Sequence, residues 1–219
     1  MHLPDVQTNR AYPLDSLPQE FDPCHLVELN LSYSHLQKLW GGTKNLDMLK
    51  TCKLCHSQQL TEVDDLCKAQ NIELIDLQGC TKLQRFPATG QLRHLRVVNL
   101  SGCTEIRSIP ENLDMLKTCK LCYSQQLTEV DDLSKAQNIE LIDLHGCTKL
   151  QRFPATGQLR HLRVVNLSGC TEIRSNIVEL HLQGTGTREL PISLVSPSQE
   201  DNLNLDKLTS LAQVIKSAS

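Results

Sequence analysis

Aromatic residues are scarce in this chain of 219 residues, which has three Phe, three Tyr and one Trp. Because so few rings cannot fill a core, Leu, Ile and Val must build it, and Leu alone occurs 38 times. No apolar run approaches the roughly 18 residues of a membrane-spanning helix. The polar first ten residues lack the apolar stretch of a secretory signal. The net charge of -3 shows no basic excess, so we expect neither a membrane nor a nucleic acid as a partner.

Ten cysteines are present, which is many for a chain of this length. Without a secretory signal, thiols are expected to stay reduced and not to form disulfides. The sequence therefore predicts an intracellular protein, located in the cytoplasm, in the nucleus or in both.

A long segment of the chain occurs twice. Residues 45–108 recur as residues 112–175, at an offset of 67 positions. The two copies differ at three of 64 positions, where His56, Cys67 and Gln78 of the first copy correspond to Tyr123, Ser134 and His145 of the second. Copies this similar indicate a tandem duplication, so both segments are expected to fold alike.

A shorter period runs through both copies and beyond them. Its template is LxxLxLxx followed by a small residue, and it fits eight times. The fits begin at Leu26, Leu49, Ile72, Leu95, Leu116, Ile139, Leu162 and Ile177, so that successive starts lie 23, 23, 23, 21, 23, 23 and 15 residues apart. Apart from the last spacing, this period is typical of leucine-rich repeats, which span about 20–29 residues.

Each template predicts a short strand whose two central apolar residues face a core, because alternate strand residues point to opposite faces. Single coils cannot bury that face, so stability requires stacking. Apolar–Pro steps such as Phe86-Pro87 predict the turns on the other side. The expected fold is α/β, an open leucine-rich-repeat solenoid of about eight coils, with parallel strands on the concave face and 3₁₀ or short helical turns on the convex face. The predicted boundaries are a frayed segment 1–11, the solenoid 12–191, and a polar tail or weak cap 192–219.

Two CxxC pairs, Cys52–Cys55 and Cys119–Cys122, have a spacing that can bind zinc. Residues three apart on a strand face opposite sides, however, so neither pair can converge on one ion. No GxSxG or HExxH motif occurs. We predict no catalytic residue, metal or cofactor, and hence no enzyme. The small residue that ends each template should sit in a tight turn and bond to the backbone; these residues are Ser34, Ser57, Cys80, Cys103, Ser124, Cys147, Cys170 and Thr185.

The outward strand positions are the candidate binding surface, because repeat proteins bind on the concave surface that their strands line. Mixed charge with a few rings suits a protein partner better than a phosphate ligand or a small-molecule substrate. A plain solvated surface is the alternative for each residue taken alone. The candidate residues are Glu28, Asn30, Tyr33, Lys53, His56, Asp76, Gln78, Asn99, Lys120, Tyr123, Asp143, His145, Asn166, Glu179 and His181.

Two segments contain sequence motifs that are more specific than the periodic spacing of Leu residues. Residues 12–40 read YPLDSLPQEFDPCHLVELNLSYSHLQKLW, and residues 64–80 read DDLCKAQNIELIDLQGC. The first is similar to the start of the repeat domain in plant immune receptors of the TIR-NB-LRR family, and the second resembles the phrase PDLSxAxNLExLxLxxC of that family. The resemblance covers about residues 12–191. It implies a leucine-rich-repeat fold and a role in protein recognition.

The other parts of such a receptor have no counterpart in the sequence. There is no GxxxxGK[ST] phosphate loop and no TIR domain. The resemblance implies a recognition module of plant innate immunity that senses a pathogen effector or regulates a partner receptor. Two alternatives stay open. One is a truncated, degenerate product of a duplicated resistance locus without activity of its own, which the 15-residue coil favours. The other is an NAD-cleaving enzyme, if a longer form carries a TIR domain.

Overall fold

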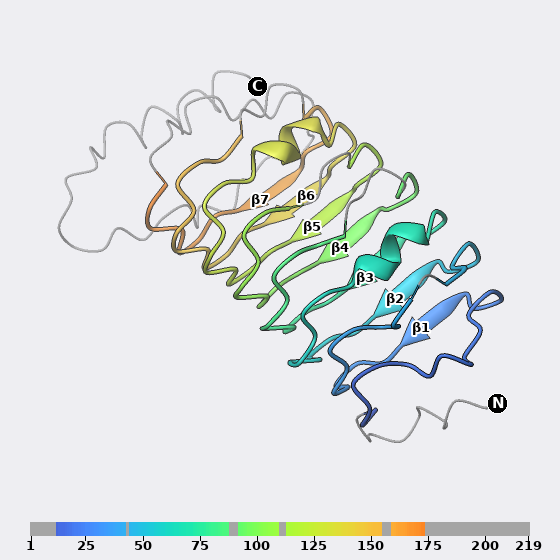
Figure 1. The fold of residues 1–219 in the computed structure, drawn as a ribbon. Coiled ribbons are helices and arrows are strands. Elements are labelled where there is room, and N and C mark those ends of the chain that lie inside the picture. The colour runs from blue at the N-terminus through green and yellow to red at the C-terminus, as the bar shows by residue number, and fades with distance from the viewer. Residues whose placement is uncertain (1–11, 43, 88–91, 110–112, 155–158, 174–219) are drawn as a thin grey trace, which may run out of the picture.

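The computed structural model describes residues 12–42, 44–87, 92–109, 113–154 and 159–173. Within these residues the chain winds into a stack of coils, and each coil contributes one strand to a single sheet (Figure 1). The strands are parallel and lie side by side in chain order, so each coil pairs only with its neighbours, as in a solenoid. They are β1 (Glu28–Asn30), β2 (Thr51–Lys53), β3 (Leu74–Asp76), β4 (Val97–Asn99), β5 (Thr118–Lys120), β6 (Leu141–Asp143) and β7 (Val164–Asn166).

The seven strands confirm the template, since each one lies where the sequence predicts it. The predicted eighth coil, which begins at Ile177, lies outside the described residues, as do the segments 1–11 and 192–219. The seven coils form a leucine-rich-repeat solenoid with one parallel sheet.

The core is a set of columns that run along the stack. The middle residue of every strand is buried and lies opposite its counterpart in the next coil: Leu29, Cys52, Ile75, Val98, Cys119, Ile142 and Val165. A second column, two residues further on, consists of seven buried Leu residues from Leu31 to Leu167. Because burying one such side chain stabilises by about 1.5–3 kcal/mol, the coils are held together mainly by apolar contact between neighbours.

The small residue after each strand is buried, and in five of the seven coils its side chain donates to a backbone carbonyl of the coil before it. Four thiols donate to a backbone carbonyl at 3.0 to 3.2 Å: Cys80 to Leu54, Cys103 to Leu77, Cys147 to Leu121 and Cys170 to Leu144. Ser57 donates to the Leu31 carbonyl in the same way. The expected bond to the backbone is thus confirmed for these five residues, with an acceptor in the preceding coil, but not for Ser34 and Ser124. Thr185 lies outside the described residues. These bonds therefore connect coils as well as shaping turns.

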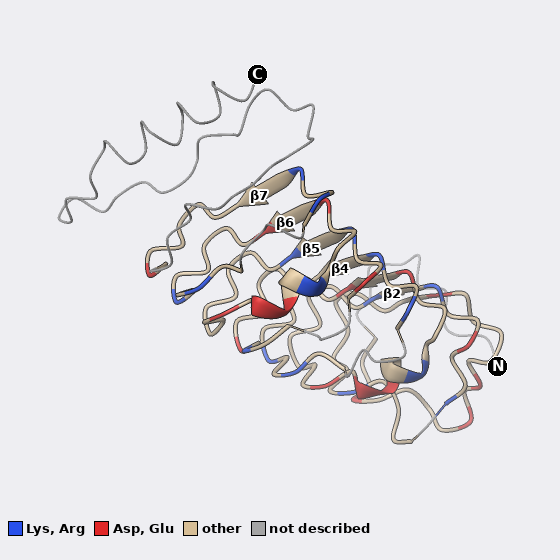
Figure 2. Ribbon diagram, turned by 90° about the horizontal axis from the view of Figure 1, so that it is seen from above, with Lys and Arg blue, Asp and Glu red and all other residues tan. Residues whose placement is uncertain are grey.

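Two short helices lie on the side of the solenoid away from the strands (Figure 2). The 3₁₀ helices η1 (Asp64–Lys68) and η2 (Asp131–Lys135) occupy equivalent places in the two copies, and each buries one Leu. They confirm the expectation of 3₁₀ turns on that side. In the part of the chain that the structure describes, no helix has the length and apolar character to cross a membrane.

The N-terminal end of the stack is closed by an aromatic pair. Trp40 is 2% exposed and its ring lies parallel to that of Phe21, with the ring centres 6.3 Å apart. The backbone N–H of Trp40 donates to Asp65 Oδ2 at 3.1 Å, which ties this end to η1.

Candidate functional site

The outward surface of the sheet, here called the strand face, carries two columns of residues from the strands themselves. In each strand the middle residue is buried and the two flanking residues point outward. The first column is Glu28, Thr51, Leu74, Val97, Thr118, Leu141 and Val164, and the second is Asn30, Lys53, Asp76, Asn99, Lys120, Asp143 and Asn166.

The second column was predicted from the sequence, but the apolar members of the first were not. Leu74, Val97 and Leu141 are half-buried on the strand face, and Val164 is 38% exposed. The signal was present: strands that read LID and VVN have two apolar residues in succession, and alternation forces one of them outward. The strand face is therefore partly aliphatic.

The Asn and Asp residues of the second column also act locally. Asp76 Oδ1 accepts the backbone N–H of Gln78 at 3.2 Å, and Asn99 Oδ1 accepts that of Ser101 at 3.1 Å. Asn30, Asp143 and Asn166 do the same two residues on, at 3.1 to 3.3 Å. These five predicted binding residues thus fix the turns that follow five of the seven strands.

The two lysines of the second column differ in their surroundings. Lys53 Nζ lies 3.0 Å from Glu28 Oε1 in the preceding strand, and this carboxylate raises the pKa of Lys53. Lys120 occupies the same place in the second copy and is exposed. It forms no ion pair with any residue within the described ranges.

Three ring residues follow the strands in a backbone conformation that favours glycine. Tyr33, His56 and Tyr123 have φ values of 62°, 58° and 59°. The equivalent residue of the other four coils is a glycine with φ between 71° and 74°. A non-glycine residue in this region costs about 1–2 kcal/mol, so three coils carry a ring here against a backbone preference.

These rings lie over the next coil. Tyr33 stacks on His56 with ring centres 4.9 Å apart. Tyr123 meets His145 edge to face at 4.9 Å, and His145 Nε2 lies 2.8 Å from Tyr123 Oη. Tyr33 is 63% exposed and Tyr123 is 53% exposed, so both present ring surface to solvent at the end of the strand face.

The structure thus brings four predicted site residues together in two pairs, Tyr33 with His56 and Tyr123 with His145. The sequence reasoning named them but missed their conformation. The signal that could have found it is the alignment of Tyr33, His56 and Tyr123 with the glycine of the other coils. Of the remaining candidates, Gln78 Oε1 accepts from Asn99 Nδ2 at 3.4 Å. Glu179 and His181 lie outside the described residues.

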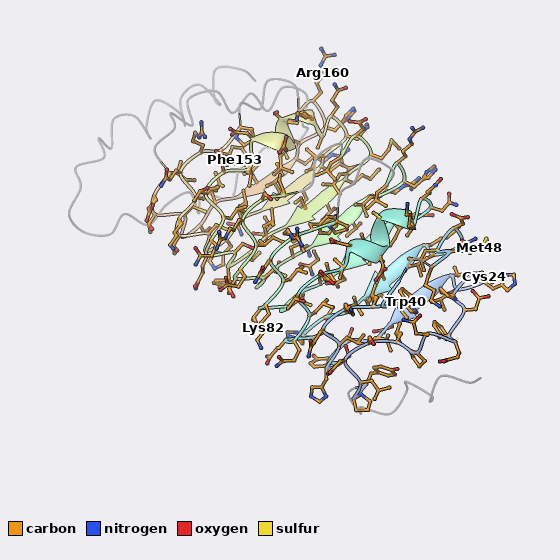
Figure 3. The ribbon with its side chains drawn as sticks, in the orientation of Figure 1. Cys24, Trp40, Met48, Lys82, Phe153 and Arg160 are labelled. Atoms are coloured by element: carbon orange, nitrogen blue, oxygen red, sulfur yellow. The ribbon has the colours of Figure 1, made fainter. Side chains whose placement is uncertain are left out.

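Charged residues lie where the strands begin, and others lie on the 3₁₀ helices and along the opposite edge (Figure 2). Where the strands begin, Lys50 pairs with Glu73 at 3.8 Å and Lys117 pairs with Glu140 at 3.0 Å, which lowers the pKa of Glu140. Arg160 projects from the same edge (Figure 3). Lys82 projects from the opposite edge, where the strands end (Figure 3).

The cysteines are placed as core and turn residues. Cys52 and Cys119 are fully buried in the strands, and burial raises the pKa of each to about 12. Cys55 and Cys122, their CxxC partners, are half-buried on the strand face and approach backbone carbonyls at 3.9 and 4.0 Å. Among the described residues no three His, Cys, Asp or Glu side chains gather closely enough to hold a metal ion.

Comparison with known proteins gives a consistent result. A family model described as Leucine Rich Repeat matches residues 25–44. The chain is 45% identical over 228 residues to Disease resistance protein RRS1B of Arabidopsis thaliana. This alignment covers 82% of this chain and 17% of that protein. It is 46% identical over 223 residues to Disease resistance protein RRS1 and 34% identical over 209 residues to Disease resistance protein RPP2A, both of Arabidopsis thaliana. These matches cover 82% and 93% of this chain and 16% and 13% of those proteins.

The chain therefore spans about one-sixth of the length of the curated relatives that it matches. Among solved structures, the leucine-rich repeat domain of the type III effector XopL matches with a TM-score of 0.44 at 19% identity, covering 67% of this chain and 70% of that one. Repeat period, strand stack and relatives together identify the chain as a leucine-rich-repeat solenoid similar to a region of plant disease resistance proteins.

Proposed function

We propose that the strand face binds a protein in plant immunity, either a pathogen effector or a partner immune receptor. Leucine-rich-repeat solenoids generally serve as protein-interaction modules with extended binding surfaces, and the relatives are disease resistance proteins. The chain acts by recognition and supplies no catalytic group. We also propose an intracellular location, cytoplasmic or nuclear, which the ten free thiols support.

One observation carries this proposal: the rings of Tyr33, His56 and Tyr123 at glycine-like backbone positions. Residues held in a disfavoured conformation point to a function that outweighs the loss in stability. Tyr is also enriched in protein interfaces, because its ring offers apolar area and its hydroxyl a hydrogen bond. The exposed Tyr33 and Tyr123 rings border the half-aliphatic strand face, which suits a protein surface.

Photo-crosslinking from defined positions tests the proposal. A photoreactive phenylalanine replaces Tyr33 or Tyr123 in the full chain, and in matched controls it replaces Lys68 or Lys135 on the 3₁₀ helices of the opposite side. After irradiation with extracts of infected plant tissue, we expect discrete protein adducts from the two Tyr positions only.

Equal adducts from both sides would contradict recognition through the strand face. The absence of adducts from a monodisperse, folded chain would contradict protein recognition as a whole. An unfolded chain would contradict the proposed function and support the alternative, a degenerate product of a duplicated resistance locus without activity of its own.

A further inference from the structure

The duplication places identical sequence against different neighbours. Lys53 and Lys120 both lie in the sequence TCKLC, in β2 and β5. β2 pairs with β1, whose first residue is Glu28, whereas β5 pairs with β4, whose first residue is Val97. The 3.0 Å ion pair of Lys53 with Glu28 therefore has no equivalent at Lys120. Lys120 is unpaired because the strand before β5 is β4, from the end of the first copy, which has no glutamate at the place of Glu28.

The coil that precedes β5 brings further cations to this junction. Arg93 and Arg96 lie just before β4 and are exposed. The backbone carbonyl of Arg96 accepts the N–H groups of Lys117 and Thr118 at 2.8 and 3.0 Å, which fixes the two coils side by side. Neither arginine forms an ion pair with the residues that the structure describes.

Nearby carboxylates are largely engaged elsewhere. Glu73 pairs with Lys50 and Glu140 pairs with Lys117. Asp143 lies opposite Lys120 in β6, forms no ion pair with it, and accepts the backbone N–H of His145. Asp114 is exposed at the start of the β5 coil. Around β4 and β5 the cations thus exceed the free carboxylates.

Beyond the end of β5, next to these cations, lies an aromatic pair that has no equivalent at the same positions of the first copy. Tyr123 and His145 stand where the first copy has His56 and Gln78. Val97 follows Arg96 at the start of β4, lies opposite Thr118 of β5 and is half-buried on the strand face. The junction surface is defined as Arg93, Arg96, Val97, Lys120 and Tyr123.

We propose that the junction surface binds an acidic segment of a protein partner, with carboxylates against Arg93, Arg96 and Lys120 and an apolar side chain against Tyr123. The inference rests on the proposed function and names the chemistry of its partner. Charge complementarity is its basis, since cations without an internal partner attract and orient an acidic ligand.

Carboxylates in and beside the two neighbouring strands limit what fits there. The coil of β3 carries Glu73 and Asp76, and the coil of β6 carries Glu140 and Asp143. A long polyanion lying along the solenoid would pass both Asp76 and Asp143, whereas a short acidic segment over β4 and β5 would lie beside Asp143 alone, which is opposite Lys120 in β6. This favours an acidic peptide over a nucleic acid.

The test uses a matched pair of variants of the full chain, Lys120→Gln and Lys53→Gln. Each removes one positive charge from the same local sequence, so the long-range change in charge is equal. The probe is a fluorescein-labelled oligoglutamate peptide, followed by fluorescence anisotropy at about 0.05 M and about 0.15 M salt. We expect binding that weakens with salt, and a Kd about tenfold higher for Lys120→Gln, with Lys53→Gln close to the unmodified chain.

Equal Kd values for the two variants, whether raised or unchanged, would overturn the junction assignment, as would a lack of peptide binding. Tighter binding of an oligothymidylate that also depends on Lys120 would replace the acidic protein by a phosphate ligand. The photo-crosslinking result is independent of these outcomes. Adducts from Tyr123 together with an unaffected Lys120→Gln variant would leave the strand-face function standing and overturn only the acidic segment.

Discussion

Single residues in this solenoid are set by the coil next to them as much as by their own sequence. Gly146 has a φ of +71°, and a Cβ built on it would lie 2.6 Å from Cδ1 of Tyr123. Gly102 has a similar φ of +74°, but its Cβ would meet only Gly79 Cα at 3.5 Å, an ordinary contact. The two glycines share a backbone requirement, and only one of them also makes room for a ring.

We expect Gly146→Ala to destabilise the chain more than Gly102→Ala. In both variants the free energy of unfolding should fall by about 1–2 kcal/mol, because an L-residue is disfavoured at this φ. Gly146→Ala should lose about 1–3 kcal/mol more, because the ring of Tyr123 must move and give up its contact with His145. Urea unfolding measures both values. Adding Tyr123→Gly should remove the extra loss, and equal losses for the two alanine variants would show that the ring does not lie over Gly146.

The two buried serines after β2 and β5 form a second natural comparison. Ser57 Oγ lies 2.8 Å from Ser34 Oγ and donates to the Leu31 carbonyl at 3.3 Å. Ser124 Oγ is buried without a hydrogen-bond partner. An unsatisfied buried hydroxyl costs about 1–3 kcal/mol, so the same residue stabilises one copy and weakens the other.

Ser124→Ala should therefore raise the free energy of unfolding by about 1 kcal/mol, whereas Ser57→Ala should lower it by about 1 kcal/mol. Chemical unfolding of the two variants under identical conditions decides the sign. A loss of stability in Ser124→Ala would mean that its hydroxyl has a partner in solution.

At the scale of elements, the two 3₁₀ helices have the same backbone but different contacts. In η1, Asp65 Oδ2 accepts the Trp40 N–H at 3.1 Å and anchors the N-terminal end. In η2, Asp132 Oδ1 bonds Lys135 Nζ at 2.7 Å on the surface. Such an exposed i,i+3 pair contributes little to stability.

We expect Asp65→Ala to lower the free energy of unfolding by about 1–3 kcal/mol, because it leaves a partly buried N–H unpaired. Asp132→Ala should lower it by about 0.5 kcal/mol or less. Urea unfolding of both variants measures the difference. Similar losses would contradict the anchoring role of η1.

The charge of Asp65 adds a dependence on pH. Burial raises the pKa of Asp65 above its ordinary value, so the folded chain holds this proton more tightly than the unfolded chain does. The resulting contribution to stability is present at low pH and is lost as the pH rises through the raised pKa. Asp65→Asn keeps an oxygen for Trp40 and removes the titration. Compared with this variant, the unmodified chain should gain stability as the pH falls through the raised pKa toward the ordinary pKa of an aspartate, and parallel pH profiles would contradict that.

At the scale of the whole molecule, periodicity predicted the strands but not the surface. Alternation fixes which residue of TCK or LID is buried, and all seven strands follow it. The environments of Lys53 and Lys120 could not be predicted from that pattern, because their local sequences are identical and only the preceding coil differs. The rings of Tyr33 and Tyr123 were selected as candidates, but their overlap with the next coil depends on stacking that the template does not encode.

Deleting residues 45–111 tests this reading of the junction. The deletion removes one copy and joins Lys44 to Asn112, which repeats the natural Lys44-Asn45 step. Since solenoid stability is a sum over neighbouring coils, the shortened chain should unfold cooperatively, with a lower midpoint and a smaller m-value in guanidinium. Lys120 would then take the place of Lys53, opposite Asn30 and within reach of Glu28, and affinity for oligoglutamate should fall. Undiminished affinity would show that the copy junction is not the binding surface.

The junction surface requires that the coils form a single stack that is continuous across the duplication. Hydrogen exchange of the full chain, followed by mass spectrometry, tests it directly. The register of β4 with β5 equals that of β3 with β4, so peptides containing β3, β4, β5 and β6 should show similar protection and exchange together near the global unfolding free energy. Fast exchange confined to β4 and β5, or separate exchange of residues 45–108 and 112–175, would contradict the continuous stack and with it the junction surface.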